Sequence, residues 1–238
     1  MNTVLFDLDG TLLPIEEEPF TKVYFKELSR KLIPDGFDPS QLVSMVWAGT
    51  KCMMKNDGQR PNIDVFWAEF ARLSGRKDVE SIRAKCDDFY SNEFHAAKVV
   101  VGDAPHSASV VRRLRQKGYK LALATNPVFP LVGVSTRLAW IGLNPSDFDH
   151  ITTYENSRFC KPNPGYYGDI LAALGVSPQD CLMVGNHATE DMCFSALGGQ
   201  VYLVTDHLIH EGGEDISGHP KGSMADFVRI VETLPTLT

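Results

Sequence analysis

Polar residues suited to catalysis follow four short, separate apolar segments of this chain. In chain order they are Asp7 and Asp9, Thr125 and Asn126, Lys161, and the run from Asn186 to Asp191. The apolar segments before them are typical of buried strands. If those strands are parallel, all four polar groups converge at one edge of the sheet, where ligands of such sheets bind.

Together, these residue types describe a site for phosphoryl transfer. Of the carboxylates at Asp7 and Asp9, one can attack a phosphorus atom while the other transfers protons. Carboxylates packed together need a cation, and Mg²⁺ prefers oxygen ligands. Thr125 and Lys161 supply hydrogen bonds and positive charge to phosphate oxygens. The set therefore predicts a Mg²⁺ cofactor and an aspartyl-phosphate intermediate.

The four groups resemble, in order and spacing, the motifs of the haloacid dehalogenase-like hydrolases. The matching segments are Asp7-Leu8-Asp9-Gly10-Thr11-Leu12, Ala124-Thr125-Asn126, Lys161-Pro162-Asn163-Pro164 and residues 185–191. The first of these, a DxDGT motif, is highly specific, and the other three gain weight from their order. The resemblance covers about residues 1–15 and 97–238. It implies a core of parallel strands and a helical cap that opens and closes over the site.

The resemblance also implies a role for each matching residue. Asp7 would attack phosphorus, and Asp9 would protonate the leaving oxygen and then activate water. Dehalogenases of the family lack an acid at the position of Asp9, because a halide leaves without a proton. Its presence here favours the cleavage of phosphate esters. The candidate phosphate-binding residues are Thr125, Asn126, Lys161 and Gly10.

The metal ligands implied by the resemblance include one departure from the family pattern. Mg²⁺ would be bound by Asp7, the backbone carbonyl of Asp9 and Asp191. Many members carry Asp where this chain has Asn186, which keeps an oxygen ligand but removes one negative charge. Our hypothesis is that Asn186 orients a metal-bound water while Asp191 supplies the direct carboxylate. Glu190 remains a rival for that direct role.

The order of the predicted elements indicates an α/β core interrupted by helices. Apolar residues recur at helical spacing from about residue 19 to residue 95, and strands alternate with helices after about residue 97. We expect a Rossmann-like parallel sheet flanked by helices, formed by residues 1–15 and 97–238. Residues 16–96 would form the cap domain. Asn62 is expected to cap one cap helix, and a core helix is expected over Glu190–Leu197.

Composition narrows the possible partners of the protein. The chain has 238 residues and a formal net charge of -7, so it lacks a broad positive field for nucleic acid or anionic membranes. Its five cysteines are an odd number and form no CxxC pair, which favours reduced thiols in a cytoplasmic protein. No apolar run approaches the roughly 18 residues of a membrane span. The expected partner is a small phosphorylated molecule, and the oligomeric state stays open.

The sequence therefore predicts a Mg²⁺-dependent phosphatase acting on a small phosphorylated metabolite. One alternative is a sugar-phosphate phosphomutase of the same fold, in which a second hydroxyl replaces water as acceptor. Another is a phosphate-binding or regulatory protein that has lost turnover, with Asn186 as the trace of that loss. The cap would choose the substrate, but Trp47, Trp67 and the cap phenylalanines are expected to form its core. His187 is expected to be a solvated loop residue.

Overall fold

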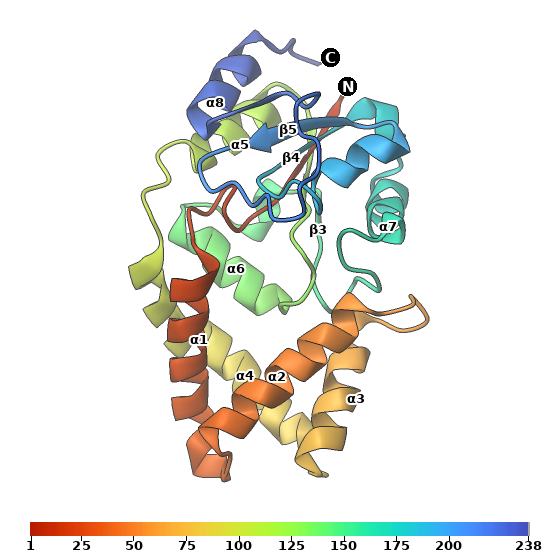
Figure 1. The fold of residues 1–238 in the computed structure, drawn as a ribbon. Coiled ribbons are helices and arrows are strands. Elements are labelled where there is room, and N and C mark those ends of the chain that lie inside the picture. The colour runs from red at the N-terminus through yellow and green to blue at the C-terminus, as the bar shows by residue number, and fades with distance from the viewer. Residues whose placement is uncertain (238) are drawn as a thin grey trace.

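The computed structural model describes residues 1–237 as an α/β core with helices inserted after its first strand (Figure 1). The sheet has six parallel strands in the order β3-β2-β1-β4-β5-β6. The strands are β1 (Thr3–Phe6), β2 (Lys120–Leu123), β3 (His150–Ile151), β4 (Cys181–Gly185), β5 (Gln200–Val204) and β6 (Lys221–Gly222). The parallel sheet and the inserted helices confirm the predicted fold class.

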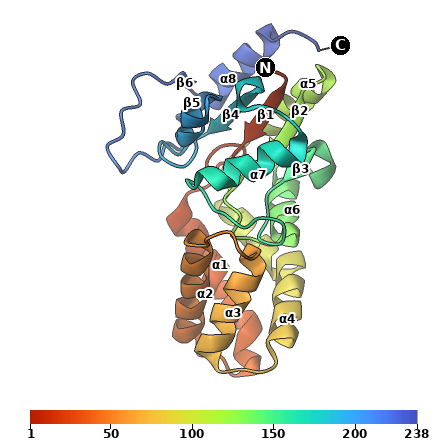
Figure 2. The ribbon, with the colours of Figure 1, turned by 90° about the vertical axis from the view of Figure 1, so that its right-hand side faces the viewer.

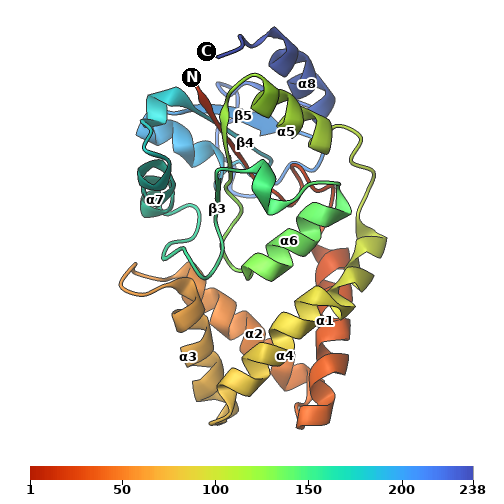
Figure 3. The same cartoon turned by 180° about the vertical axis from the view of Figure 1, so that it is seen from behind.

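Helices cover both faces of the sheet, which explains why its central strands are apolar throughout. One face packs against α5 (Ser107–Gln116), α6 (Leu131–Trp140) and α8 (Met224–Thr233), all of which lie on the near side in Figure 3. The other face packs against α7 (Pro164–Leu174) and the 3-10 helix η5 (Met192–Leu197). Side chains alternate along β1, so Val4 and Phe6 enter the first layer and Leu5 the second.

The inserted region, which we call the cap, projects from the core on the side opposite the two chain ends (Figure 2). Its elements are α1 (Glu17–Leu32), η1 (Ile33–Asp35), α2 (Pro39–Met54), α3 (Asn62–Ser74), α4 (Val79–Ser91) and η2 (Glu93–Val100). Amphipathic stripes on these helices face one another, as in a small bundle. The position of the insertion after β1 agrees with a helical cap. The proposed domain boundaries at residues 15/16 and 96/97 stay a prediction.

Two local predictions were wrong, and one short strand was not predicted. Asn62 is the first residue of α3 rather than its N-cap, because its fully buried amide instead donates to the carbonyl of Pro127 in the core. The helix expected over residues 190–197 is the shorter 3-10 helix η5, since residues 186–191 form a turn in which the Asp191 amide donates to the His187 carbonyl. The two-residue strand β6 carries no apolar pattern, and the sequence analysis missed it.

Among residues 1–237, no helix has both the length and the apolar character that a membrane span requires. The five cysteines are free thiols, as their odd number and wide spacing suggested.

Candidate active site

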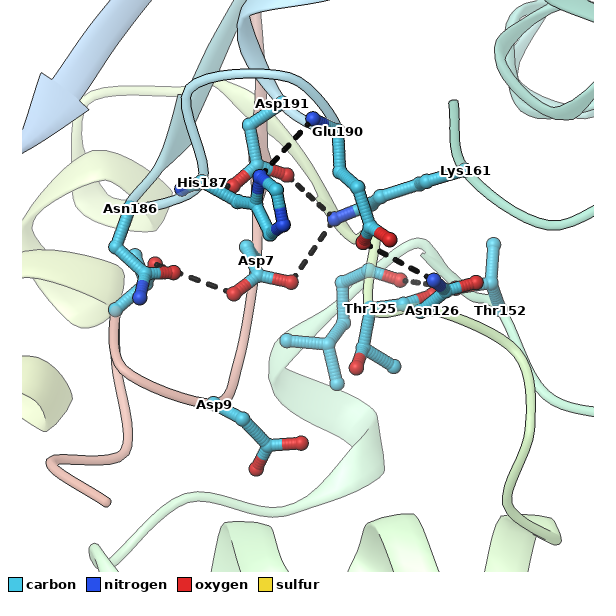
Figure 4. Close-up of polar contacts among 12 residues, drawn as sticks. Asp7, Asp9, Thr125, Asn126, Thr152, Lys161, Asn186, His187, Glu190 and Asp191 are labelled. Carbon is cyan, nitrogen blue, oxygen red and sulfur yellow. Dashed lines mark hydrogen bonds and ion pairs between the residues drawn. The ribbon is translucent and has the colours of Figure 1, made fainter. Parts of the chain in front are cut away.

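Strand register brings three of the four polar groups together. Phe6, at the end of β1, pairs with Leu123 of β2 on one side and with Val184 of β4 on the other. The segments that follow these strands therefore leave the sheet side by side. Figure 4 shows Asp7, Thr125 and Asn186 around one space, with the Lys161 ammonium entering from the loop before α7.

A buried lysine joins two carboxylates at the centre of this space. Lys161 Nζ lies 2.9 Å from Asp7 Oδ1 and 2.6 Å from Asp191 Oδ1, and the Lys161 side chain is 1% exposed. Burial raises the pKa of Asp7 to about 7; the Lys161 charge opposes this rise, and the Asp191 charge adds to it. Burial acts to lower the pKa of Lys161, but Asp191 and Asp7 outweigh it and hold that pKa well above its usual range. Lys161 is therefore a fixed cation.

Asn186 is fixed at both ends of its amide. Its Oδ1 accepts a hydrogen bond of 3.0 Å from the Thr11 hydroxyl, which also lies 3.2 Å from Asp7 Oδ2. Its Nδ2 donates to the carbonyl of His207 over 2.6 Å. A Cβ on Gly10 would lie 2.2 Å from Asn186 Nδ2, and Gly10 adopts a φ of +80°. Gly10 thus allows the first motif to approach Asn186, and no side chain could replace it without a shift.

Asp191 is held as tightly as Asn186. Its Oδ2 accepts a hydrogen bond of 2.9 Å from the His187 backbone N–H, while its Oδ1 faces Lys161. A Cβ on Gly185 would meet Asp191 Oδ2 at 2.1 Å, so a glycine at this point lets the carboxylate fold back towards β4. Both oxygens of the Asp191 carboxylate therefore have a partner, which is the Lys161 ammonium for Oδ1 and the His187 backbone N–H for Oδ2.

Glu190 faces a different neighbour. Its Oε2 accepts a hydrogen bond of 3.0 Å from Asn126 Nδ2, and its backbone carbonyl accepts one of 2.8 Å from the Tyr167 hydroxyl. Burial raises the pKa of Glu190, an effect that the Lys161 and His187 charges oppose. In Figure 4 the Glu190 carboxylate turns towards Asn126, on the side where Thr125 also lies.

Asp9 pairs with an arginine that the sequence analysis missed. The Asp9 carboxylate forms a short ion pair with Arg137 of α6, whose side chain is fully buried. The Arg137 guanidinium also lies 4.3 Å from the centre of the Phe129 ring. Figure 4 shows the Asp9 carboxylate directed away from Asp7. Arg137 lies in the last turn of α6, directly after Ser135 and Thr136, and only its fully buried charge, which a sequence cannot reveal, marks it as exceptional.

Thr125 contributes through its position at the end of β2. Its carbonyl accepts hydrogen bonds from the hydroxyls of Thr152, at 2.6 Å, and Tyr166, at 2.9 Å. The Thr125 side chain lines the same space as Asp7 and Asp9. Two buried hydroxyls thus brace the backbone from which the Thr125 hydroxyl extends.

These residues stand at one end of a cavity of about 980 Å³ that extends into the cap. The core end is lined by Asp7, Asp9, Thr125, Asn126, Asn186, His187, Glu190 and Asp191. The cap end is lined by aromatic and aliphatic side chains, including Phe20, Tyr24, Phe25, Leu28, Val46, Trp47, Phe66, Trp67 and Phe70. His187 is half-buried beside the cavity rather than fully solvated. The cap aromatics pack together as expected, yet many of them also face this cavity.

The donor set at the core end has the chemistry of a Mg²⁺ site. Asp7, Asp191 and Asn186 bring side-chain oxygens together at the ends of β1 and β4, and hard cations prefer oxygen ligands. Within residues 1–237 no three or more His, Cys, Asp or Glu side chains are grouped so that they alone could hold a metal ion, so an ion here would also need the Asn186 amide oxygen or a backbone carbonyl.

A family model and two curated relatives match the chain. The model of the haloacid dehalogenase-like hydrolases matches residues 1–194. A phosphoserine phosphatase of Thermus thermophilus is 24% identical over 228 residues, which cover 84% of this chain and 86% of that protein. A glyceraldehyde 3-phosphate phosphatase of Methanothermobacter thermautotrophicus is 26% identical over 111 residues, or 47% of this chain and 48% of that protein. The chain thus spans about half the length of this second relative.

A solved structure supports the fold over the full length. A phosphatase of the same family from Thermococcus onnurineus aligns with a TM-score of 0.58 and 21% identity, covering 100% of both chains. At this identity the match shows a common fold, and the substrate does not follow from it.

Proposed function

This chain belongs to the haloacid dehalogenase-like hydrolases, a family of enzymes that includes phosphatases, and we propose that it hydrolyses a small-molecule phosphate monoester through a phosphorylated Asp7. The observation that carries the proposal is the buried Lys161 ammonium between Asp7 and Asp191, two carboxylates that line a large cavity. A fixed cation beside a nucleophilic carboxylate suits a phosphoryl group whose oxygens carry negative charge.

In the proposed reaction Asp7 attacks phosphorus and Asp9 gives a proton to the leaving alkoxide. Asp9 then takes a proton from the water that attacks the phosphoaspartate, so the enzyme returns to its starting state. Lys161 and Thr125 hold the oxygens of the transferring group. Arg137 holds the Asp9 carboxylate, which lines the cavity where the leaving group would lie.

Enzymes of this family typically use Mg²⁺, and the oxygen donors here fit such an ion. We propose that Asp7, Asp191 and the backbone carbonyl of Asp9 would hold it, with Asn186 as an oxygen donor at its side. When bound, Mg²⁺ would offset the charge that gathers on the phosphoryl oxygens. The Thr11 hydroxyl orients the Asn186 oxygen and one oxygen of Asp7 at the same time.

Phosphate release from p-nitrophenyl phosphate, with and without Mg²⁺, tests the proposal. Wild-type protein should release phosphate only with the metal, and Asp7→Asn should abolish release because an amide cannot attack phosphorus effectively. Asp64→Asn, at an exposed site on α3 away from the cavity, is the matched control and should retain activity. Unchanged turnover in Asp7→Asn would contradict the proposal, as would a wild-type protein without activity on any phosphate ester.

The acceptor of the phosphoryl group separates a phosphatase from a phosphomutase. A mutase on a sugar phosphate must bind a second phosphate group, which calls for cations away from Asp7. The cavity lining, as described for residues 1–237, contains no lysine or arginine, and this favours water as the acceptor. Product analysis with a sugar phosphate checks this, since a mutase would return an isomer in place of inorganic phosphate.

A further inference from the structure

The cavity divides sharply into an acidic end and an apolar end. Its acidic residues lie on the core or at the start of α1, and they are Asp7, Asp9, Glu16, Glu17, Glu190, Asp191, Asp206 and Glu211. Its cap end is formed by side chains of α1, α2, α3 and α4, of which most are aromatic or aliphatic. A substrate with its phosphate at Asp7 would therefore extend its leaving group into apolar surroundings.

No lysine or arginine among residues 1–237 stands free along the path of that leaving group, and the two lining histidines, His187 and His207, lie at the core end. The lining residues described include neither lysine nor arginine. The two buried cations next to the cavity, Lys161 and Arg137, are already paired with Asp7, Asp191 and Asp9. A carboxylate or second phosphate on the leaving group would meet carboxylates or apolar walls, and burying such a charge without a partner is costly.

The polar atoms at the cap end are few and neutral. The hydroxyls of Tyr24 and Tyr90 bond to each other over 2.9 Å, so each already has a partner. Burial raises the pKa of both hydroxyls above the usual range, so neither offers a charge near neutral pH. The rest of this end presents rings such as Phe25, Trp47 and Phe66, which favour apolar contact area.

We infer that the substrate is the phosphate monoester of an uncharged, largely apolar alcohol, with an aliphatic or aromatic body that lies between the cap helices. This inference rests on the proposed phosphatase function and adds the chemical class of the leaving group. A cavity of about 980 Å³ accommodates a drug-sized body rather than a two- or three-carbon metabolite. Charge complementarity excludes phosphorylated acids and bisphosphates from this class.

A series of alkyl phosphates tests the inference with the leaving-group chemistry held constant. From ethyl to octyl phosphate, below aggregation concentrations, kcat/KM should rise about threefold for each methylene, as apolar burial predicts. Hexyl phosphate is paired with 6-phosphooxyhexanoate, which has the same chain with a terminal carboxylate. The carboxylate should lower kcat/KM about 100-fold or more, because the cavity offers that charge no partner.

Binding of non-hydrolysable phosphonates separates this inference from the proposed function. Hexylphosphonate should bind about 200-fold more tightly than methylphosphonate in calorimetry with Mg²⁺ present, which is the same threefold gain over five methylenes. Equal affinities, or esters hydrolysed with no gain from chain length, would overturn the inference and leave the phosphatase proposal standing. Tight hexylphosphonate binding without hydrolysis of any ester would instead overturn the phosphatase function.

A charge-introducing variant locates the effect in the cap. Thr50 is half-buried on α2 and lines the cavity, so Thr50→Arg should place a cation at its side. The preference for hexyl phosphate over 6-phosphooxyhexanoate should shrink about tenfold or more in this variant. Gln41→Arg adds the same charge on the exposed side of α2, outside the lining, and should leave the preference unchanged. If the ratio of kcat/KM for hexyl phosphate to that for 6-phosphooxyhexanoate were equal in the two variants, the leaving group would not lie in the cap end of the cavity.

Discussion

The two ends of the cavity achieve their organisation by opposite means. At the core end, the central charged groups are buried and paired, as with Lys161 between Asp7 and Asp191. At the cap end, rings such as Trp47 and Phe66 offer apolar surface, whose contacts do not require a fixed orientation of the partner. Catalytic charges must be positioned to within a fraction of an ångström, and rigid strand ends can provide that precision. Apolar contacts need less precise positioning, so helices outside the core can provide them. We therefore propose that reaction and substrate choice reside in different parts of this chain.

Among substitutions that leave the nucleophile Asp7 in place, the largest effect is expected from removing the cation at the core end. Lys161→Met should lower kcat/KM about 10³-fold, since it deletes a preorganised charge at the phosphoryl oxygens. It should also lower the free energy of unfolding by about 3 kcal/mol in the absence of Mg²⁺, because Asp7 and Asp191 lose their buried partner. Steady-state kinetics and urea unfolding measure the two losses.

Lys98→Met is the control for that change, because Lys98 is exposed and stands outside the cavity lining. It should match wild-type protein in both measurements. If the activity of Lys161→Met stayed within a few fold of the wild-type activity, the division into a charged catalytic end and an apolar binding end would be wrong.

Arg137 provides the next largest test, because it acts through Asp9 rather than on the substrate. Arg137→Met should lower kcat about 30-fold for alkyl phosphates, which need a proton on the leaving oxygen. The loss should be far smaller for p-nitrophenyl phosphate, whose leaving group departs without one. Arg137→Lys should restore part of the activity because it restores the positive charge. Equal losses on both esters would mark Arg137 as a structural residue only.

At the cap end, single substitutions should have smaller effects that depend on the substrate. Trp47 lines the cavity and is 45% exposed, so Trp47→Ala should remove contact area without a core defect. We expect kcat/KM for octyl phosphate to fall about fivefold to tenfold, and that for ethyl phosphate to stay within twofold. Leu73→Ala, at an exposed apolar residue of α3 outside the lining, is the control. A uniform loss across chain lengths would place Trp47 outside the binding surface.

The sequence predicted the core end far better than the cap end, for a physical reason. Asp7, Thr125, Lys161 and Asn186 each follow a strand, and parallel strands bring their carboxyl ends to one edge. Local patterns thus imply a three-dimensional site. The same patterns failed for η5, because the turn at residues 186–191 is set by hydrogen bonds of Asp191 and not by apolar spacing.

The sequence predicted less about the cap, because the shape of the cavity there depends on how four helices pack. Helical periodicity predicted an apolar stripe of Phe66, Phe70 and Leu73, which is what a cap core requires. Whether such a stripe closes completely or leaves a cavity depends on volumes summed over several helices. The pairing of Arg137 with Asp9 spans 128 positions in sequence and had no local signal either.

The smallest effect is expected at Glu190, the rival of Asp191 for the metal. The Glu190 carboxylate already accepts a hydrogen bond from Asn126, and it turns away from the oxygens of Asp7 and Asn186 in Figure 4. Glu190→Gln keeps that hydrogen bond in reach and should weaken Mg²⁺ binding about threefold at most, the size of a screened charge interaction. Asp191→Asn should weaken it about tenfold to 100-fold. Calorimetric Mg²⁺ titration of both variants without substrate gives the comparison, and a larger loss in Glu190→Gln would move the metal towards Asn126 and Thr125.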